Sequence, residues 1–300
     1  MASSTNGRQF LDPAVVARLG TLELKARTIV EGFLSGLHRS PFKGFSVEFA
    51  EYRQYIPGDD LNTIDWKVFA RSDRHYVKKF EEETNLDCHV VFDASGSMGY
   101  GSGPITKHEY ACCLAASLAY LMSRQRDRVG LATFSSRMLD VVPASARPGH
   151  LRSLLLALDR LTPGDETDIA KPLHQLADTL SKRGMVVLIS DLLDDPERVV
   201  RGLRHFQFNG TDVIVFHVLD PFELTFPFDR PTRFEDLETS DEVVAVPSAV
   251  RSSYLKAMNE MIDRYKRDLG SSGIDYHQIT TDQPLELALL AYLSTRARLL

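Results

Sequence analysis

The sequence predicts an α/β protein with a doubly wound, mainly parallel sheet and helices on both faces. Short apolar runs typical of buried parallel strands recur after residue 85, beginning with Cys88 to Phe92. Segments whose apolar residues have helical spacing alternate with these runs. Strands that alternate with helices imply right-handed crossovers, and these connect parallel strands.

Residues 1–84 are expected to form a helical and β extension that packs on the main domain. Asp12-Pro13 is typical of a helix start, and apolar residues at helical spacing continue from there to Leu37. Strands are predicted at Phe45 to Ala50 and at Tyr76 to Phe80. This part is too small and too mixed to stand alone, so we expect it to lie against the larger C-terminal part of the chain.

Residues 85–300 are expected to form the main domain. Its further strands are predicted at Val129 to Phe134, Met138 to Val142, Met185 to Ser190, Asp212 to Val218 and Ile274 to Ile279. Its helices are predicted at Ala111 to Met122, Leu151 to Leu161, Ile169 to Leu180, Tyr254 to Leu269 and Pro284 to Leu299. The stretch 221–247, rich in proline, phenylalanine and acidic residues, breaks this rhythm and is predicted to be an insertion.

Composition and charge exclude several classes of protein. The 300 residues are 43% hydrophobic and carry a net charge of −6 with both signs interspersed, which disfavours nucleic-acid binding. The longest uncharged stretch, Tyr110 to Ser123, is shorter than the roughly 20 apolar residues of a membrane span. The N-terminus lacks an export signal, and the three cysteines have neither metal-type spacing nor an even number. A cytoplasmic location is therefore expected.

Five polar residues are predicted to meet at one edge of the sheet. Asp93, Ser95 and Ser97 leave the first buried strand in one loop, Asp191 follows another strand, and Thr167 precedes a helix. In a doubly wound sheet, ligands bind beyond the carboxyl ends of the strands. Alternate spacing lets the three loop side chains point at one place. Two carboxylates and three hydroxyls form an all-oxygen set that suits Mg²⁺ or Mn²⁺.

The same ordered set resembles the metal-ion-dependent adhesion site of von Willebrand factor type A domains. Other segments resemble a more particular bacterial family, that of domain of unknown function 58: Glu48 to Asp60, Ile64 to Lys67 and Tyr276 to Arg296. The resemblance runs across nearly the whole chain and implies a von Willebrand factor A-like fold. One departure is Gly164-Asp165-Glu166, which stands where a Gly-Gly pair usually precedes the threonine.

The leading hypothesis is a metal-dependent protein-interaction module that is not an enzyme. Ser95 and Ser97 are expected to be direct ligands, Thr167 direct in one state, and Asp93 and Asp191 to act mainly through water. A partner's Asp or Glu carboxylate would complete the ion's shell. Met98, Tyr100 and the loop Gly99 to Gly103 are expected to form the rim. The family resemblance also implies cooperation with a MoxR-type AAA+ ATPase in chaperone-like assembly or maturation.

Other interpretations stay open. Thr167 is as well placed to cap a helix beginning at Asp168 as to hold an ion. A metal-dependent hydrolase would use Asp93 or Ser97, although Ser97 lacks the first glycine of a nucleophile elbow. A third interpretation is a structural scaffold with a vestigial metal site. The cluster Asp59 to Arg71 is predicted to be either a salt-bridged turn or a partner surface.

Overall fold

A six-stranded sheet forms the centre of the computed structural model, which describes residues 11–38, 52–54, 76–78, 86–164, 167–180, 184–239 and 241–299. The strand order is β10-β7-β6-β3-β4-β5, and all neighbours are parallel except β4 and β5. The bounds are β3 Asp87–Asp93, β4 Arg128–Phe134, β5 Met138–Ser145, β6 Gly184–Ser190, β7 Thr211–Leu219 and β10 Asp275–Thr280. The predicted edge strand is β5, which is antiparallel to its neighbour.

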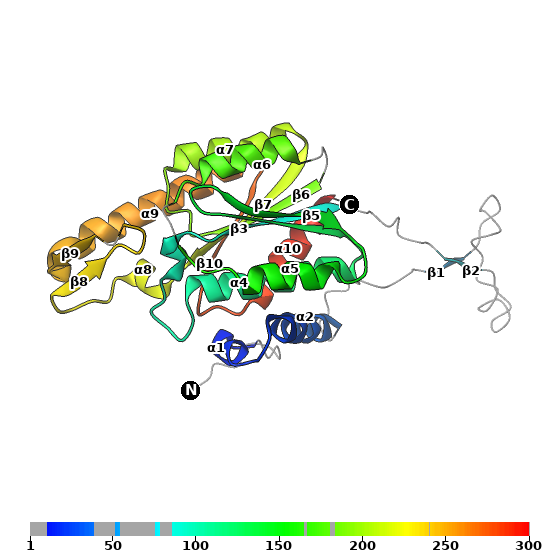
Figure 1. The fold of residues 1–300 in the computed structure, drawn as a ribbon, viewed down its shortest axis with the longest axis horizontal. Coiled ribbons are helices and arrows are strands. Elements are labelled where there is room, and N and C mark those ends of the chain that lie inside the picture. The colour runs from blue at the N-terminus through cyan, green and yellow to red at the C-terminus, as the bar shows by residue number, and fades with distance from the viewer. Residues whose placement is uncertain are drawn as a thin grey trace.

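Helices cover both faces of this sheet (Figure 1). One face carries α1 Pro13–Ala17, α2 Leu22–His38, α4 Lys107–Arg124, α5 His150–Asp159 and α10 Glu286–Leu299. The other carries α6 Ala170–Thr179, α7 Pro196–Phe208 and α9 Pro247–Ser271. The predicted doubly wound, mainly parallel sheet is therefore confirmed.

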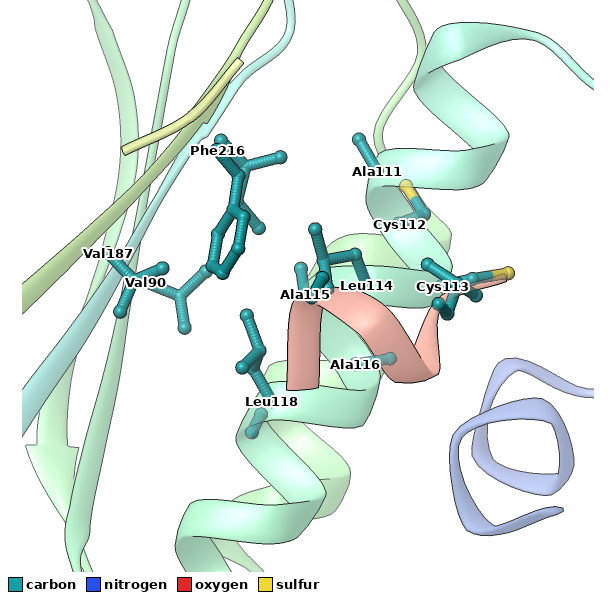
Figure 2. Close-up of a cluster of buried hydrophobic side chains, with 14 of the residues drawn as sticks. Val90, Ala111, Cys112, Cys113, Leu114, Ala115, Ala116, Leu118, Val187 and Phe216 are labelled. Carbon is teal, nitrogen blue, oxygen red and sulfur yellow. The ribbon is translucent and has the colours of Figure 1, made fainter. Parts of the chain in front are cut away.

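Alternate strand residues supply the two cores, because successive side chains of a strand point to opposite faces. Val90 belongs to the core under α4, whereas its neighbour Val91 belongs to the core on the other face. Figure 2 shows Val90 and Phe216 facing Leu118 of α4, which is fully buried. Burying one such side chain stabilises the fold by roughly 1.5–3 kcal/mol.

Several elements differ from the prediction, among them the N-terminal helix and α7. The expected single N-terminal helix is two helices: α1 ends at Ala17, and α2 begins at Leu22, where the hydroxyl of Thr21 accepts a hydrogen bond from the backbone nitrogen of Leu24. The helix α7 was not predicted at all. Its start, Asp195-Pro196, has the same cap-and-proline pattern as Asp12-Pro13.

The segment 221–247 contains a short helix and a hairpin. These are α8 Pro221–Thr225 and the antiparallel strands β8 Thr232–Glu235 and β9 Glu242–Ala245. Aromatic rings hold the hairpin's base: Phe234 stacks on Phe226 with 5.6 Å between ring centroids, and Phe226 lies 4.7 Å from Tyr254 of α9. The hairpin lies at one end of the molecule in Figure 1.

In the N-terminal part, β1 Tyr52–Gln54 pairs antiparallel with β2 Tyr76–Lys78. The strand expected at residues 45–50 and the cluster Asp59 to Arg71 lie outside the described residues. The division into residues 1–84 and 85–300 stays a prediction.

Candidate functional site

Two carboxylates lie where the winding of the sheet reverses. The chain leaves β3 for β4 on one side and later returns to β6 on the other side of β3. Asp93 is the last residue of β3, and Asp191 follows the last residue of β6. The carboxyl edge at such a switch point is the usual ligand site of an open α/β sheet. The structure therefore brings Asp93 and Asp191 to the position that the sequence predicted.

The loop after β3 gathers the two serines beside Asp93. Ser97 lies in the short 3-10 helix Gly96–Gly99, and its Oγ is 3.1 Å from Oγ of Ser95. The backbone nitrogen of Ser95 donates to Oδ1 of Asp93 at 2.9 Å. Oγ of Ser190 donates to Oδ2 of Asp93 at 2.5 Å. The Asp93 carboxylate is thus held by both of its oxygens.

Charging Asp93 is unfavourable in the absence of a cation. Burial raises the pKa of Asp93 to about 7, and the charge of Asp191 contributes to this rise. Hydrogen bonds from Ser190 and Ser95 act in the opposite direction. A bound cation stabilises an ionised carboxylate and lowers its pKa.

Lys107 is a site residue that the sequence analysis missed. It is the first residue of α4 and fully buried, and its Nζ lies 2.7 Å from Oδ2 of Asp191 and 2.6 Å from Oε1 of Glu223. Burial lowers the pKa of Lys107, but Asp191 and Glu223 outweigh burial and hold the pKa above its ordinary value. The ammonium group links Asp191 to α8. A sequence signal did exist, because Thr106 and Glu109 form a capping box that places Lys107 at a helix start.

His217 holds the backbone of Asp191 from the neighbouring strand. Its Nε2 lies 2.7 Å from the carbonyl oxygen of Asp191, and its Nδ1 lies 2.7 Å from the hydroxyl of Tyr276. Because a carbonyl oxygen only accepts, Nε2 carries the proton and Nδ1 accepts from Tyr276. Burial lowers the pKa of His217 to about 4, so the ring is neutral at pH 7. His217 therefore positions Asp191.

Thr167 contacts the segment 221–247 and does not cap a helix. Its backbone nitrogen donates to Oε2 of Glu238 at 2.9 Å, and its hydroxyl donates to Oε1 of the same carboxylate. The next helix, α6, begins at Ala170, and its N-cap residue Ile169 makes no side-chain cap. The capping interpretation of Thr167 is therefore wrong. Residues 165 and 166 lie outside the described residues.

Glu238 connects Thr167 to the serine loop. A Cβ atom built on Gly96 would lie 3.1 Å from Cγ of Glu238 and 2.6 Å from the carbonyl oxygen of Leu237. Thr167 and the serine loop therefore contact the same hairpin tip. The expected rim needs one correction, because Met98 is fully buried and belongs to the core.

The donor set fits a small hard cation. Adjacent ligands of an octahedral Mg²⁺, at about 2.0–2.1 Å from the ion, are about 2.8–3.0 Å apart. The hydroxyl oxygens of Ser95 and Ser97 share a hydrogen bond of 3.1 Å, a separation slightly longer than that spacing. In the described part of the chain, no three His, Cys, Asp or Glu side chains gather as a metal site. An ion at this edge would therefore depend on hydroxyl ligands.

The fold and the site define an α/β protein whose polar residues gather at the switch point of a parallel sheet. The chain belongs to the DUF58 family, "Protein of unknown function DUF58", which matches residues 51–263. An uncharacterized protein of Mycobacterium tuberculosis is 27% identical over 291 residues, which cover 96% of this chain and 91% of that protein. The family expected from the sequence is thus confirmed.

One solved structure shares the fold at low sequence identity, and a second is similar at a lower score. The conserved hypothetical protein BatB from Bacteroides thetaiotaomicron is 14% identical, with a TM-score of 0.50 over 71% of this chain and 98% of that chain. An aerotolerance-related membrane protein from Bacteroides fragilis is 16% identical, with a TM-score of 0.48 over 70% of this chain and 99% of that chain. Among the described helices of the present chain, none is long and apolar enough to cross a bilayer.

Proposed function

We propose that this protein is a metal-dependent protein-interaction module of the von Willebrand factor A-like type. The observation that carries the proposal is the pair of serine hydroxyls 3.1 Å apart, beside the buried carboxylates of Asp93 and Asp191 at the switch point. Mg²⁺, or Mn²⁺, would be held by Asp93, Ser95, Ser97, Thr167 and Asp191.

Each residue has a distinct part in this proposal. Ser95 and Ser97 offer neutral oxygens, while Asp93 and Asp191 supply negative charge from fixed positions. When bound, the ion offers an open position to a partner's Asp or Glu carboxylate. Thr167 already donates two hydrogen bonds to a carboxylate, that of Glu238. The site is thus suited to acidic side chains of proteins.

Several contacts support binding rather than catalysis. The hydrogen-bond partner of the Ser97 hydroxyl is Ser95, not a histidine that would act as a general base. Both oxygens of Asp93 accept hydrogen bonds within the site, which leaves the carboxylate poorly placed for nucleophilic attack. We therefore propose that the protein is not an enzyme.

The proposal extends to a partner and a location. Similarity to the DUF58 family suggests cooperation with a MoxR-type AAA+ ATPase in chaperone-like assembly or maturation. The three cysteines are buried and free of disulfides, as suits a reducing compartment such as the cytoplasm. The client's contribution would be one accessible acidic side chain.

One contact favours a second candidate, a scaffold whose metal site is vestigial. Lys107 places an ammonium group 2.7 Å from Asp191 and so offsets part of its negative charge, although the same ammonium also pairs with Glu223 at 2.6 Å. If that charge replaces the ion, the site stabilises the fold and binds no metal. Measured metal affinity separates the two candidates.

The experiment is thermal unfolding with and without millimolar Mg²⁺ or Mn²⁺. A ligand that binds only the folded state stabilises it, by about 2.7 kcal/mol at 100 times its Kd. Ser95→Ala with Ser97→Ala should abolish the rise in Tm, while Ser252→Ala with Ser253→Ala on the exposed surface of α9 should keep it. A rise that survives the site variant places the ion elsewhere. No rise in the wild-type protein supports the scaffold.

A further inference from the structure

The tip of the β8–β9 hairpin is bound to the candidate site as a ligand would be. Glu238 directs both carboxylate oxygens at Thr167, one to the backbone nitrogen and one to the hydroxyl. Hydrogen bonds from two donors to one charged carboxylate are among the stronger ones in proteins. The contact joins residues 71 positions apart in the chain.

The serine loop is shaped to receive this tip. Gly96 is buried, and a Cβ at that position would stand only 2.6 Å from the carbonyl oxygen of Leu237. Only glycine permits so close an approach of two backbones. The tip therefore lies directly against the loop that carries Ser95 and Ser97.

The hairpin also presents Glu238 in a fixed conformation. Oδ1 of Asp236 accepts hydrogen bonds from the backbone nitrogens of Glu238 and Thr239, at 2.8 and 3.2 Å. The backbone nitrogen of Asp236 donates to the carbonyl oxygen of Asp241 at 2.8 Å and closes the turn. The acidic side chain is therefore pre-organised for its site.

None of the described residues of the β8–β9 hairpin belongs to the two cores of the sheet. Its strands pair only with each other, and Val243 and Val244 of β9 are 62% and 74% exposed. Away from the tip, an aromatic contact of Phe234 with Phe226 and Phe228 attaches the hairpin. A segment with few buried contacts opens at low free-energy cost.

We propose that the β8–β9 hairpin is an internal ligand, in which Glu238 occupies the carboxylate position that an acidic partner must take. This inference rests on the proposed function, whose site it shares. The acidic side chain of a partner then competes for the site with Glu238, which belongs to the same chain as the site. Its apparent affinity is reduced by the fraction of molecules in which the hairpin is docked.

The first test is hydrogen exchange of the full chain in chelator, because the Thr167 contact needs no ion. Glu238→Gln removes the charge and keeps the shape, and it should speed exchange of the amides of residues 232–245 by about ten-fold. The matched control Glu235→Gln changes an exposed carboxylate of the same hairpin and should leave exchange unchanged. Equal exchange in Glu238→Gln and the wild-type protein overturns the docking contact.

The second test measures competition with a fluorescent synthetic peptide that copies residues 232–245, added in the presence of Mg²⁺. The Glu238→Gln chain should bind the peptide about ten-fold more tightly than the wild-type chain, because its own hairpin no longer competes. Adding Thr167→Ala should abolish that binding, as should the glutamine form of the peptide. Equal affinity of the two chains, including no binding by either, contradicts the internal ligand.

The two tests separate this inference from the proposed function. If no metal binds but Glu238→Gln still frees the hairpin and the peptide still competes, the internal ligand stands and metal dependence fails. If metal binds at the serines while exchange and peptide affinity do not respond to Glu238→Gln, the metal site stands and the internal ligand fails.

Discussion

Asp93 is fully buried, and burial disfavours the charged form of its carboxyl group. Its pKa of about 7 lies above the ordinary value of 3.8, chiefly because of burial and then because of Asp191. The folded protein therefore binds more protons than the unfolded chain between these two values. The stability that a protonated Asp93 contributes is complete below about pH 3.8 and is lost as the pH rises to about 7.

The first prediction concerns Asp93→Asn, which removes the charge and keeps an acceptor oxygen for the backbone nitrogen of Ser95, while its amide nitrogen would donate to the hydroxyl of Ser190. In chelator, the variant should equal the wild-type protein in stability at about pH 4 and exceed it by about 1–4 kcal/mol at about pH 8. Urea unfolding at the two pH values measures the difference. Mg²⁺ at about pH 8 should narrow the gap. A gap independent of pH would show that Asp93 is not the titrating group.

The second prediction concerns Lys107→Met, which leaves the carboxylates of Asp191 and Glu223 without their cation. Removing one member of a buried ion pair costs about 3–5 kcal/mol, because the remaining charge is uncompensated. Urea unfolding should show this loss, whereas Lys256→Met on the exposed face of α9 should cost less than about 1 kcal/mol. A small loss for Lys107→Met would mean that its carboxylates find other partners.

Sequence spacing predicted some site residues and missed others for a physical reason. Asp93, Ser95 and Ser97 lie within five residues, so local geometry alone brings them together. Lys107 reaches Asp191 across 84 positions, and Glu238 reaches Thr167 across 71. Such contacts depend on which strands are neighbours and on where an inserted hairpin folds, and no local pattern encodes either.

At the scale of elements, the hairpin tip and the serine loop fit closely only because position 96 has no side chain. The third prediction is that Gly96→Ala displaces the tip, since its Cβ would meet backbone at 2.6 Å. Limited proteolysis within residues 232–245 should become several-fold faster, because the hairpin spends more time undocked. The control Gly103→Ala, where a new Cβ meets nothing within 4 Å, should leave cleavage unchanged. Unchanged cleavage in Gly96→Ala would mean that the tip does not rest on the loop.

Apolar periodicity predicted most of the helices and strands. All six strands of the sheet were predicted. Four of them, β3, β4, β6 and β7, are short and mainly apolar runs, as is typical of buried parallel strands, whereas β5 and β10 lie at the two edges of the sheet. Helix α7 was not predicted, because charged residues interrupt its apolar pattern, although Val199, Leu203 and Phe206 have helical spacing and are buried. The break between α1 and α2 was not predicted, because apolar residues such as Leu19 and Leu22 continue the helical spacing through it.

For the whole molecule, the parallel sheet accounts for the location of the site, whereas the side chains at its edge determine the chemistry of the site.

The fourth prediction is that no covalent adduct forms with fluorophosphonates or acyl-phosphate mimics, and that ester and phosphoester substrates turn over at the background rate. The reason is that no general base is positioned at the Ser97 hydroxyl among the described residues, since its partner is Ser95. Mass spectrometry and initial rates measure both. Hydrolysis that disappears in Ser97→Ala or Asp93→Asn would replace the binding proposal with a hydrolase.

The most direct measurement is anomalous X-ray diffraction from crystals of the full chain grown with Mn²⁺. If the proposed metal site exists, one strong anomalous peak should lie at the switch point, about 2.0–2.2 Å from the hydroxyl oxygens of Ser95 and Ser97. The peak should vanish in crystals of Ser95→Ala with Ser97→Ala. A peak elsewhere in the molecule, or none at saturating Mn²⁺ with Lys107 still bound to Asp191, would contradict the metal-dependent module and leave the scaffold.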